Sequence, residues 1–104
     1  MRSLTTKSSI MFILQIEHPV PDFNGWKKAF DSDPLKRKES GVKSYRIFRV
    51  ADDPNQIIIE LEFDDLDKAK EMHEALKKLW SRVQGSIINN PQSRILEAVE
   101  SFQY

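Results

Sequence analysis

Two histidines are the side chains of this sequence best suited to acid–base chemistry. His18 follows the apolar run Met11–Glu17, and His73 lies within the amphipathic segment Leu66–Val83. An imidazole titrates near neutral pH and can take a proton from a weakly acidic group. We expect both rings and the phenol of Tyr45 to border one cavity, where they would be the catalytic groups of an enzyme. Each histidine can equally be structural, His18 bonded to backbone at the strand exit and His73 at the boundary of a helix face.

Large aromatic side chains recur at positions that should line the same interior. Aromatic walls with one or two polar groups suit flat organic ligands. The expected substrate-binding walls are Trp26, Phe30 and Trp80. Arg37, with Lys36 beside it, could close over an anionic group of the ligand. Core packing explains the aromatic residues equally well, and a basic helix surface is usually only solvated.

Other chemistries have no matching pattern. His18 and His73 are far apart in the sequence and neither lies in a zinc-binding spacing, so we expect no metal site. With no cysteine and no phosphate-binding or nucleophile motif, thiol and serine chemistry are excluded and no cofactor is expected. Glu60 and Glu62 could suggest an acid–base pair, but Arg46 on the neighbouring strand favours a plain ion pair.

Composition narrows the class of protein further. Sixteen basic and sixteen acidic residues give no net charge, so neither nucleic acid nor an anionic membrane is an expected partner. No apolar run is long enough to cross a bilayer, and the lack of cysteine fits a reducing compartment, so we expect a cytoplasmic protein. Residues 1–9 are polar and are predicted to be a disordered extension, and residues 10–104 to form one domain.

Hydrophobic periodicity predicts the elements that must position these groups. Asp22 and Asp65 are placed to cap two amphipathic helices, and a further helical turn is expected over Pro34–Glu39 with Gly41 as its stop. Gly85 should end the second helix. In chain order we expect strand Met11–Glu17, a helix after Asp22, strands Val42–Val50 and Gln56–Phe63, helix Leu66–Val83 and strand Arg94–Glu100.

The two middle strands are predicted to form a hairpin whose register follows from charge. Pairing Arg46 with Glu60 separates an apolar face from a face with an ion pair, whereas a one-residue slip would set Arg46 against Leu61. The expected pairs are Ser44 with Glu62, Tyr45 with Leu61, Arg46 with Glu60, Ile47 with Ile59, Phe48 with Ile58 and Val50 with Gln56.

The order of elements predicts an α+β, ferredoxin-like fold. Two right-handed strand–helix–strand crossovers give an antiparallel four-stranded sheet of order 4-1-3-2 with both helices on one face. The other face would leave Phe48 and Ile58 in water. A second copy is the economical cover, so we expect a homodimer through that face.

Several stretches resemble a known superfamily. They are His18–Trp26, Tyr45–Arg49, Asp52–Asn55 and Asp64–Ala69, and together they resemble the dimeric α+β barrel proteins, specifically the antibiotic biosynthesis monooxygenase-like branch. The resemblance implies two sheets paired face to face and a small-molecule pocket between each sheet and its helices. It implies no single activity, because the superfamily includes cofactor-independent monooxygenases, haem-degrading enzymes, isomerases and stress-response proteins.

Three functions remain open at this point. The first is binding of a small aromatic ligand, or cofactor-independent monooxygenation of a phenol or anthrone-like enol after deprotonation by His18 or His73. The second is a non-catalytic dimeric stress-response or structural module whose interior is filled by its own aromatic side chains. The third is haem binding with His73 as axial ligand. An open cavity would separate the first from the second.

Overall fold

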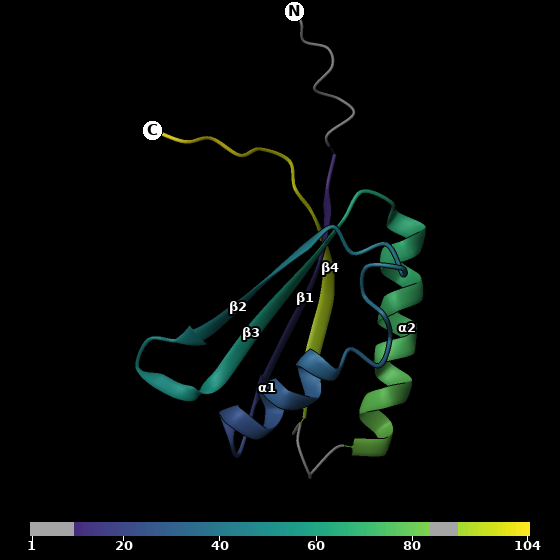
Figure 1. Ribbon diagram of the computed structural model, residues 1–104. Helices are drawn as coiled ribbons and strands as arrows, with labels where there is room; N and C mark the ends of the chain where they lie inside the picture. The colour runs from purple at the N-terminus through teal and green to yellow at the C-terminus, as the bar shows by residue number, and fades with distance from the viewer. Residues whose placement is uncertain (1–9, 84–89) are drawn as a thin grey trace, which may run out of the picture.

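The structure, a computed structural model, describes residues 10–83 and 90–104 apart from the side chain of Val83. The elements in chain order are β1 (Phe12–Pro19), α1 (Phe23–Ser32), β2 (Ser44–Val50), β3 (Asp53–Phe63), α2 (Leu66–Val83) and β4 (Gln92–Glu97) (Figure 1). The predicted extension over residues 1–9 and the predicted stop at Gly85 lie outside the described residues.

The four strands form one antiparallel sheet. Its order is β2-β3-β1-β4, which confirms the predicted 4-1-3-2 arrangement and the ferredoxin-like α+β fold. The chain's first strand, β1, therefore lies between β3 and β4. In the described residues no helix has both the length and the apolar composition that crossing a membrane requires.

Short-range contacts fix where α1 begins and ends. The carboxylate of Asp22 accepts the N–H of Gly25 at 3.2 Å, as the capping prediction requires. At the other end Asp33 adopts a left-handed conformation with φ of 54°, and its N–H donates to the carbonyl of Phe30. The predicted helical turn over Pro34–Glu39 is wrong, because Lys36 also has a positive φ of 50° and the segment forms successive turns instead.

The β2–β3 hairpin has the predicted register over most of its length. The five pairs from Ser44–Glu62 to Phe48–Ile58 are confirmed. Val50 pairs with Asp53 rather than with Gln56, because an irregularity between Arg49 and Val50 shifts the register and shortens the turn. At the other end of the chain β4 starts and stops earlier than predicted, so residues 98–104 belong to no element.

One face of the sheet carries the core, as strand alternation requires. We call it the inner face; its side chains pack against both helices. Among the buried residues of the described part of the chain, His18 alone is polar or charged. The buried apolar residues are Leu14, Ile16, Val20, Trp26, Val42, Ile57, Ile59, Leu61, Phe63, Ala69, Met72 and Trp80.

A polar row crosses all four strands on the opposite, outer face. Nε of Arg94 donates to Gln15 at 3.0 Å, and the amide of Gln15 donates to Glu60 at 3.2 Å. Glu60 also accepts from Nη2 of Arg46 at 2.7 Å, which confirms the predicted ion pair. Phe48 lies two residues along β2 from this row and is 41% exposed. The outer face thus combines a bonded polar row with uncovered apolar side chains.

Candidate functional site

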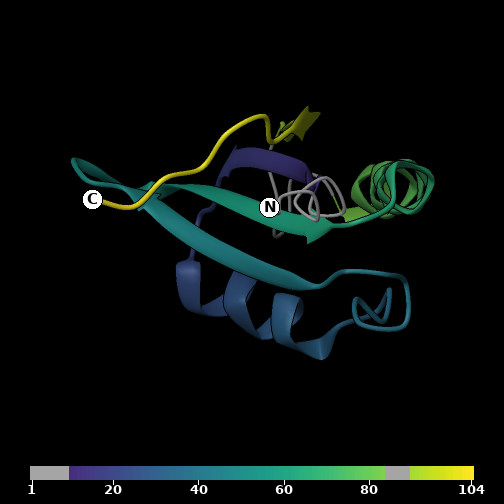
Figure 2. The same cartoon turned by 90° about the horizontal axis from the view of Figure 1, so that it is seen from above.

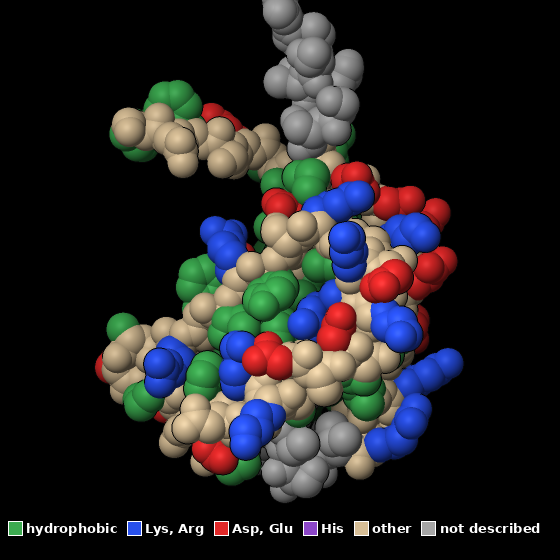
Figure 3. All heavy atoms as spheres, viewed as in Figure 1, with side chains coloured by type: hydrophobic (Ala, Val, Ile, Leu, Met, Phe, Trp, Pro, Cys, Tyr) green, Lys and Arg blue, Asp and Glu red, His purple; other side chains and the backbone are tan. Residues whose placement is uncertain are grey.

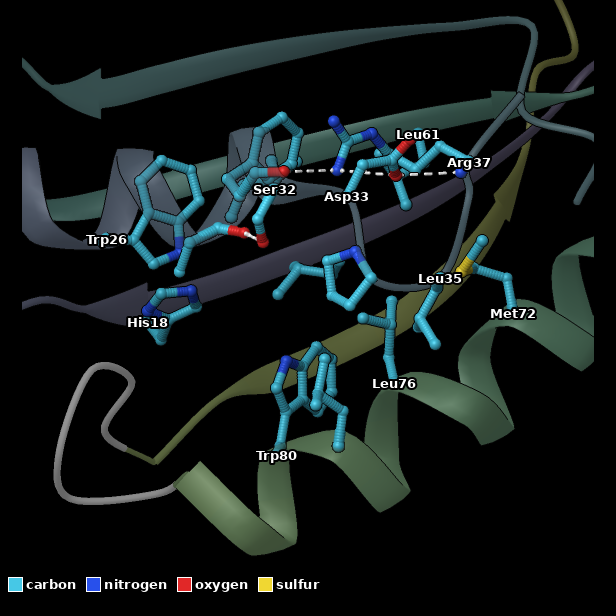
Figure 4. Close-up of a pocket in the computed structure, with 16 residues that line it drawn as sticks. His18, Trp26, Ser32, Asp33, Leu35, Arg37, Leu61, Met72, Leu76 and Trp80 are labelled. Atoms are coloured by element: carbon cyan, nitrogen blue, oxygen red, sulfur yellow. Dashed lines mark hydrogen bonds and ion pairs between the residues drawn. The ribbon is translucent and has the colours of Figure 1, made fainter. Parts of the chain in front are cut away.

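A cavity of about 180 Å³ lies between the inner face and both helices. Its size compares with an engineered cavity of about 150 Å³ that holds benzene. Figure 4 shows side chains from β1, β3, α1, α2 and the turns after α1 converging on it. The cavity walls are Ile16, His18, Trp26, Ala29, Phe30, Ser32, Asp33, Pro34, Leu35, Arg37, Ile59, Leu61, Met72, Leu76, Leu79 and Trp80. The interior is therefore open and mostly apolar.

His18 is the imidazole that borders this cavity. It lies near the end of β1, points to the inner face and is 1% exposed. Its Nδ1 lies 3.1 Å from the carbonyl oxygen of Pro19. A carbonyl can only accept, so we assign the ring hydrogen to Nδ1, which leaves Nε2 as an acceptor. Burial lowers the pKa of His18 below its usual value, against a smaller opposing effect of the Pro19 hydrogen bond, and keeps the ring neutral near pH 7.

Two indole rings line the cavity together with His18. Trp26 of α1 meets it edge to face, with the ring centroids 6.0 Å apart, and Trp80 enters from α2. Both tryptophans are buried, and in Figure 4 their ring nitrogens point toward the space beside His18. Within residues 10–83 and 90–104, no group hydrogen-bonds either indole N–H or Nε2 of His18. Buried polar atoms normally have partners, so these three nitrogens are suited to a ligand.

His73 does not join them, so the expected convergence of the two histidines is wrong. Its Nε2 lies 2.6 Å from the hydroxyl of Ser93, which ties α2 to β4, and it is absent from the cavity walls. Each helical residue is rotated about 100° from the last, so Met72 faces the cavity while its neighbour His73 turns to the sheet edge. Burial, and then the charge of Lys77, lower the pKa of His73.

Tyr45 is also outside the cavity walls. It is 44% exposed, and its ring packs edge-on against Phe30 with centroids 4.9 Å apart. Tyr45 does lie on the inner face, as its pairing with the buried Leu61 requires, but β2 is an edge strand of the sheet. The cavity is closed on that side by Phe30, so the phenol of Tyr45 does not reach it.

Arg37 lies at the cavity wall but has structural partners for its charge. Its guanidinium stacks 3.8 Å above the ring of Phe30 and donates to the Phe30 carbonyl at 2.9 Å. It also forms an ion pair with Asp33 at 3.4 Å. These contacts satisfy the carbonyl end of α1 and hold the following turns in place. Lys36, which was expected to contact an anionic ligand group together with Arg37, is exposed and is not among the cavity walls.

Several wall residues were not predicted as site residues from the sequence. Met72, Leu76 and Leu79 follow the apolar stripe of α2, so the same helical periodicity could have found them. The position of Leu35 in the wall could not be found in this way, because it depends on the left-handed backbone conformations of Asp33 and Lys36. In the part of the chain that the structure describes, no three histidine or acidic side chains gather as metal ligands do.

Comparison with known proteins identifies the fold. No family model and no curated protein sequence matches the chain. Among solved structures, a point mutant of SnoaB, described as a cofactor-independent oxygenase from Streptomyces nogalater, shares 10% identity over 91% of this chain and 98% of its own, with a TM-score of 0.67. A dimeric ferredoxin-like protein from an uncultured marine organism shares 13% identity over 98% and 99% of the two chains, also with a TM-score of 0.67.

A Nitrosomonas europaea protein, provisionally assigned as an antibiotic biosynthesis monooxygenase, has the same fold. It shares 14% identity over 86% of this chain and 90% of its own, with a TM-score of 0.65. At these identities the likeness establishes a common ferredoxin-like fold along nearly the whole chain, and the fold alone hosts many activities. The expected resemblance is confirmed at the level of the fold.

Proposed function

We propose that this protein binds a flat, largely apolar small molecule that carries one hydroxyl or enol oxygen. The single observation behind this proposal is the group of three buried nitrogens at the cavity wall, on His18, Trp26 and Trp80. A hydroxyl has the matching capacity, because it donates one hydrogen bond, here to Nε2 of His18, and accepts two, here from the indole N–H groups. Each buried polar atom left without a partner costs about 1–3 kcal/mol, so a ligand that pairs them gains accordingly.

The same arrangement supports proton transfer from a weakly acidic ligand. Neutral His18 can accept a phenol or enol proton at Nε2, while two indole N–H groups stabilise the oxyanion that forms. An enolate of this kind is easily oxidised and can pass electrons to dioxygen without a cofactor. Cofactor-independent oxygenation is thus the reaction we propose if the ligand is a substrate. Dioxygen is the oxidant: an activated CH2 group loses its two hydrogens, one oxygen atom enters the product as a carbonyl, and the other leaves as water. The description of SnoaB as a cofactor-independent oxygenase agrees with this proposal.

We further propose that the chain is a homodimer through its outer face. Phe48 is exposed there, and Ile58 lies beside it in the hairpin register. Burying the uncovered apolar side chains against a second copy removes them from water. The similar marine protein is described as dimeric.

The alternatives receive less support from the geometry. A self-filled core would leave no cavity, whereas the described side chains enclose about 180 Å³. Haem binding through His73 would need that ring inside the cavity, but it contacts Ser93 instead.

Indole N–H resonances give a direct test of binding. The chain has two tryptophans and both line the cavity, so a ¹H–¹⁵N spectrum should show two indole signals that report on the site. We expect 2-naphthol to shift both signals and to bind at least tenfold more tightly than 2-methoxynaphthalene, which cannot donate to His18. His18→Phe should abolish this preference, and His18→Gln, which keeps an acceptor, should retain part of it.

Two control variants complete the test. Ala29→Phe should fill the cavity and prevent binding of either compound, whereas Tyr45→Phe, outside the walls, should bind normally. If neither indole signal moves with either compound at millimolar concentration, the cavity is not a binding site. Equal affinity for the two compounds would refute the role of His18. For catalysis, anthrone-dependent oxygen uptake should be lost in His18→Phe, and uptake equal to that of the native chain would exclude His18 as the proton acceptor.

A further inference from the structure

The C-terminal segment, residues 98–104, is hydrogen-bonded to the rest of the described chain only at its first residue. The N–H of Ala98 donates to the carbonyl of Met11 at 2.9 Å, and beyond Ala98 no hydrogen bond or ion pair joins the segment to the other described residues. Its apolar side chains Val99, Phe102 and Tyr104 are 72% exposed or more. Figure 3 shows the segment standing clear of the molecule, and in Figure 2 it lies on the opposite side of the β2–β3 hairpin from α1.

The segment follows an extended path in Figure 1, although it forms no strand. The rings of Phe102 and Tyr104, two residues apart, meet edge to face with centroids 5.1 Å apart. In a strand, residues two apart lie on the same face, so this contact is compatible with strand pairing. Three large apolar side chains within six residues are costly to leave in water, which indicates a surface that covers them.

An edge of the sheet offers that surface. β2 pairs with β3 on one side only, so its other side presents unpaired backbone groups. β2 has seven residues, the same number as the C-terminal segment. The charges also match, since β2 carries Arg46 and Arg49 with no acidic residue, and the segment carries Glu100 with no basic one. Phe48 on this strand is exposed and can contact the segment's aromatic rings.

The segment cannot reach β2 of its own chain over a useful length. It begins where β4 ends, and β2 is at the opposite edge of the sheet, beyond β1 and β3. Crossing three strand spacings takes about 14 Å, or at least four of the seven residues. Of residues 98–104, at most three would then remain to pair with β2, which has seven residues. A second copy has no such restriction, and a two-fold arrangement lets both segments pair in the same way.

We infer that residues 98–104 of each copy add as a fifth strand to the β2 edge of the other copy. This inference rests on the proposed homodimer and identifies the part of the chain that holds it together. Backbone pairing supplies affinity. Specificity comes from side chains: the charge of Glu100 complements the arginines of β2, and the rings of Phe102 and Tyr104 can contact Phe48.

Truncation tests the contribution of the segment. The full chain and a chain ending at Ala98 would be compared by sedimentation across a range of concentrations, with circular dichroism to verify the fold. We expect the truncation to raise the dimer dissociation constant at least tenfold, and Phe102→Ser with Tyr104→Ser to raise it by a smaller factor. If the full chain is a monomer throughout, the dimer proposal itself fails. If the truncated chain dimerises as tightly as the full chain, this inference alone fails.

Cysteine crosslinking tests the location, since the native chain contains no cysteine. Gln103→Cys would be mixed under mild oxidant with Ser44→Cys, at the start of β2, or with Phe48→Cys, in its second half. Arg94→Cys on the β4 edge would be the matched control. We expect covalent heterodimers with the β2 variants and few with the control. Crosslinking to Arg94→Cys instead would overturn the inference. So would a monomeric internal disulfide in a dilute chain that carries both Ser44→Cys and Gln103→Cys.

Discussion

Acid should destabilise this protein through His18, because the folded state keeps that ring neutral. Burial lowers the pKa of His18, whereas in the unfolded chain the ring has its usual pKa of about 6.5. As the pH falls below 6.5 the unfolded chain takes up a proton that the folded chain does not, and the free energy of unfolding decreases. Stability from this group is therefore complete above pH 6.5 and is lost progressively below it.

The size of the effect follows from the number of protons. One proton taken up only by the unfolded state changes the free energy of unfolding by about 1.4 kcal/mol per pH unit. Between pH 6.5 and 5.5 the native chain should thus lose up to about 1.4 kcal/mol more than His18→Gln, which cannot titrate. In a domain of this length that difference corresponds to roughly 6 °C in Tm. Urea unfolding of both proteins at half-unit pH intervals from 8 to 5 would measure it.

A control variant separates the effect of His18 on the pH dependence of stability from the effect of His73. His73 also has a lowered pKa, but it is less buried and contacts Ser93 and the charged neighbours Lys77 and Glu74. His73→Gln should therefore change the pH dependence less than His18→Gln does. The reasoning is refuted if His18→Gln and the native chain lose stability in parallel below pH 6.5, or if the native chain gains stability there.

Three further predictions concern stability and are checked by denaturant or thermal unfolding. Leu76→Ala should cost about 2 kcal/mol, the lower end of the usual range for such truncations, because one side of Leu76 faces the open cavity; a cost below 1 kcal/mol would place it at the surface. Gly41→Ala should cost about 1 kcal/mol or more, because Gly41 has φ of 103° and a new Cβ would lie 3.2 Å from the side chain of Lys68. An unchanged midpoint would contradict this. Deletion of residues 1–9 should leave Tm within a couple of degrees, since the sequence there offers little apolar surface; a larger loss would mean that the segment packs on the domain or on a partner.

Sequence periodicity was sufficient to predict the fold, because each element carries a repeated pattern. The apolar stripe predicted α2 with its observed bounds, and the charge of Arg46 opposite Glu60 predicted the hairpin register from Ser44 to Phe48. The bulge next to Val50 could not be predicted, because it depends on how the short turn closes and not on which side chains face each other.

The candidate site was harder to predict than the fold. His18, Trp26 and Trp80 do share one cavity, but His73 and Tyr45 lie outside it. Periodicity indicates which face of a helix or strand meets the interior. It does not define the direction of each side chain closely enough to tell a cavity-lining residue from its neighbour. For His73, one step of the helix after Met72 is enough to turn the ring to Ser93. Leu35 depends on two left-handed turns that no hydrophobic pattern records.

The central place of β1 has a consequence for how the chain folds during synthesis. Phe12 pairs with Phe63 on one side and with Glu97 on the other, so β1 is synthesised before either of the strands that pair with it, β3 and β4. At about 5–20 residues per second, β3 is complete some seconds after β1, and β4 follows some seconds later still. Meanwhile β1 exposes apolar side chains on both faces, and the β2–β3 hairpin can form alone. Nascent chains stalled before β4 should therefore bind chaperones that recognise extended apolar segments, and should release them once Glu97 has cleared the ribosome.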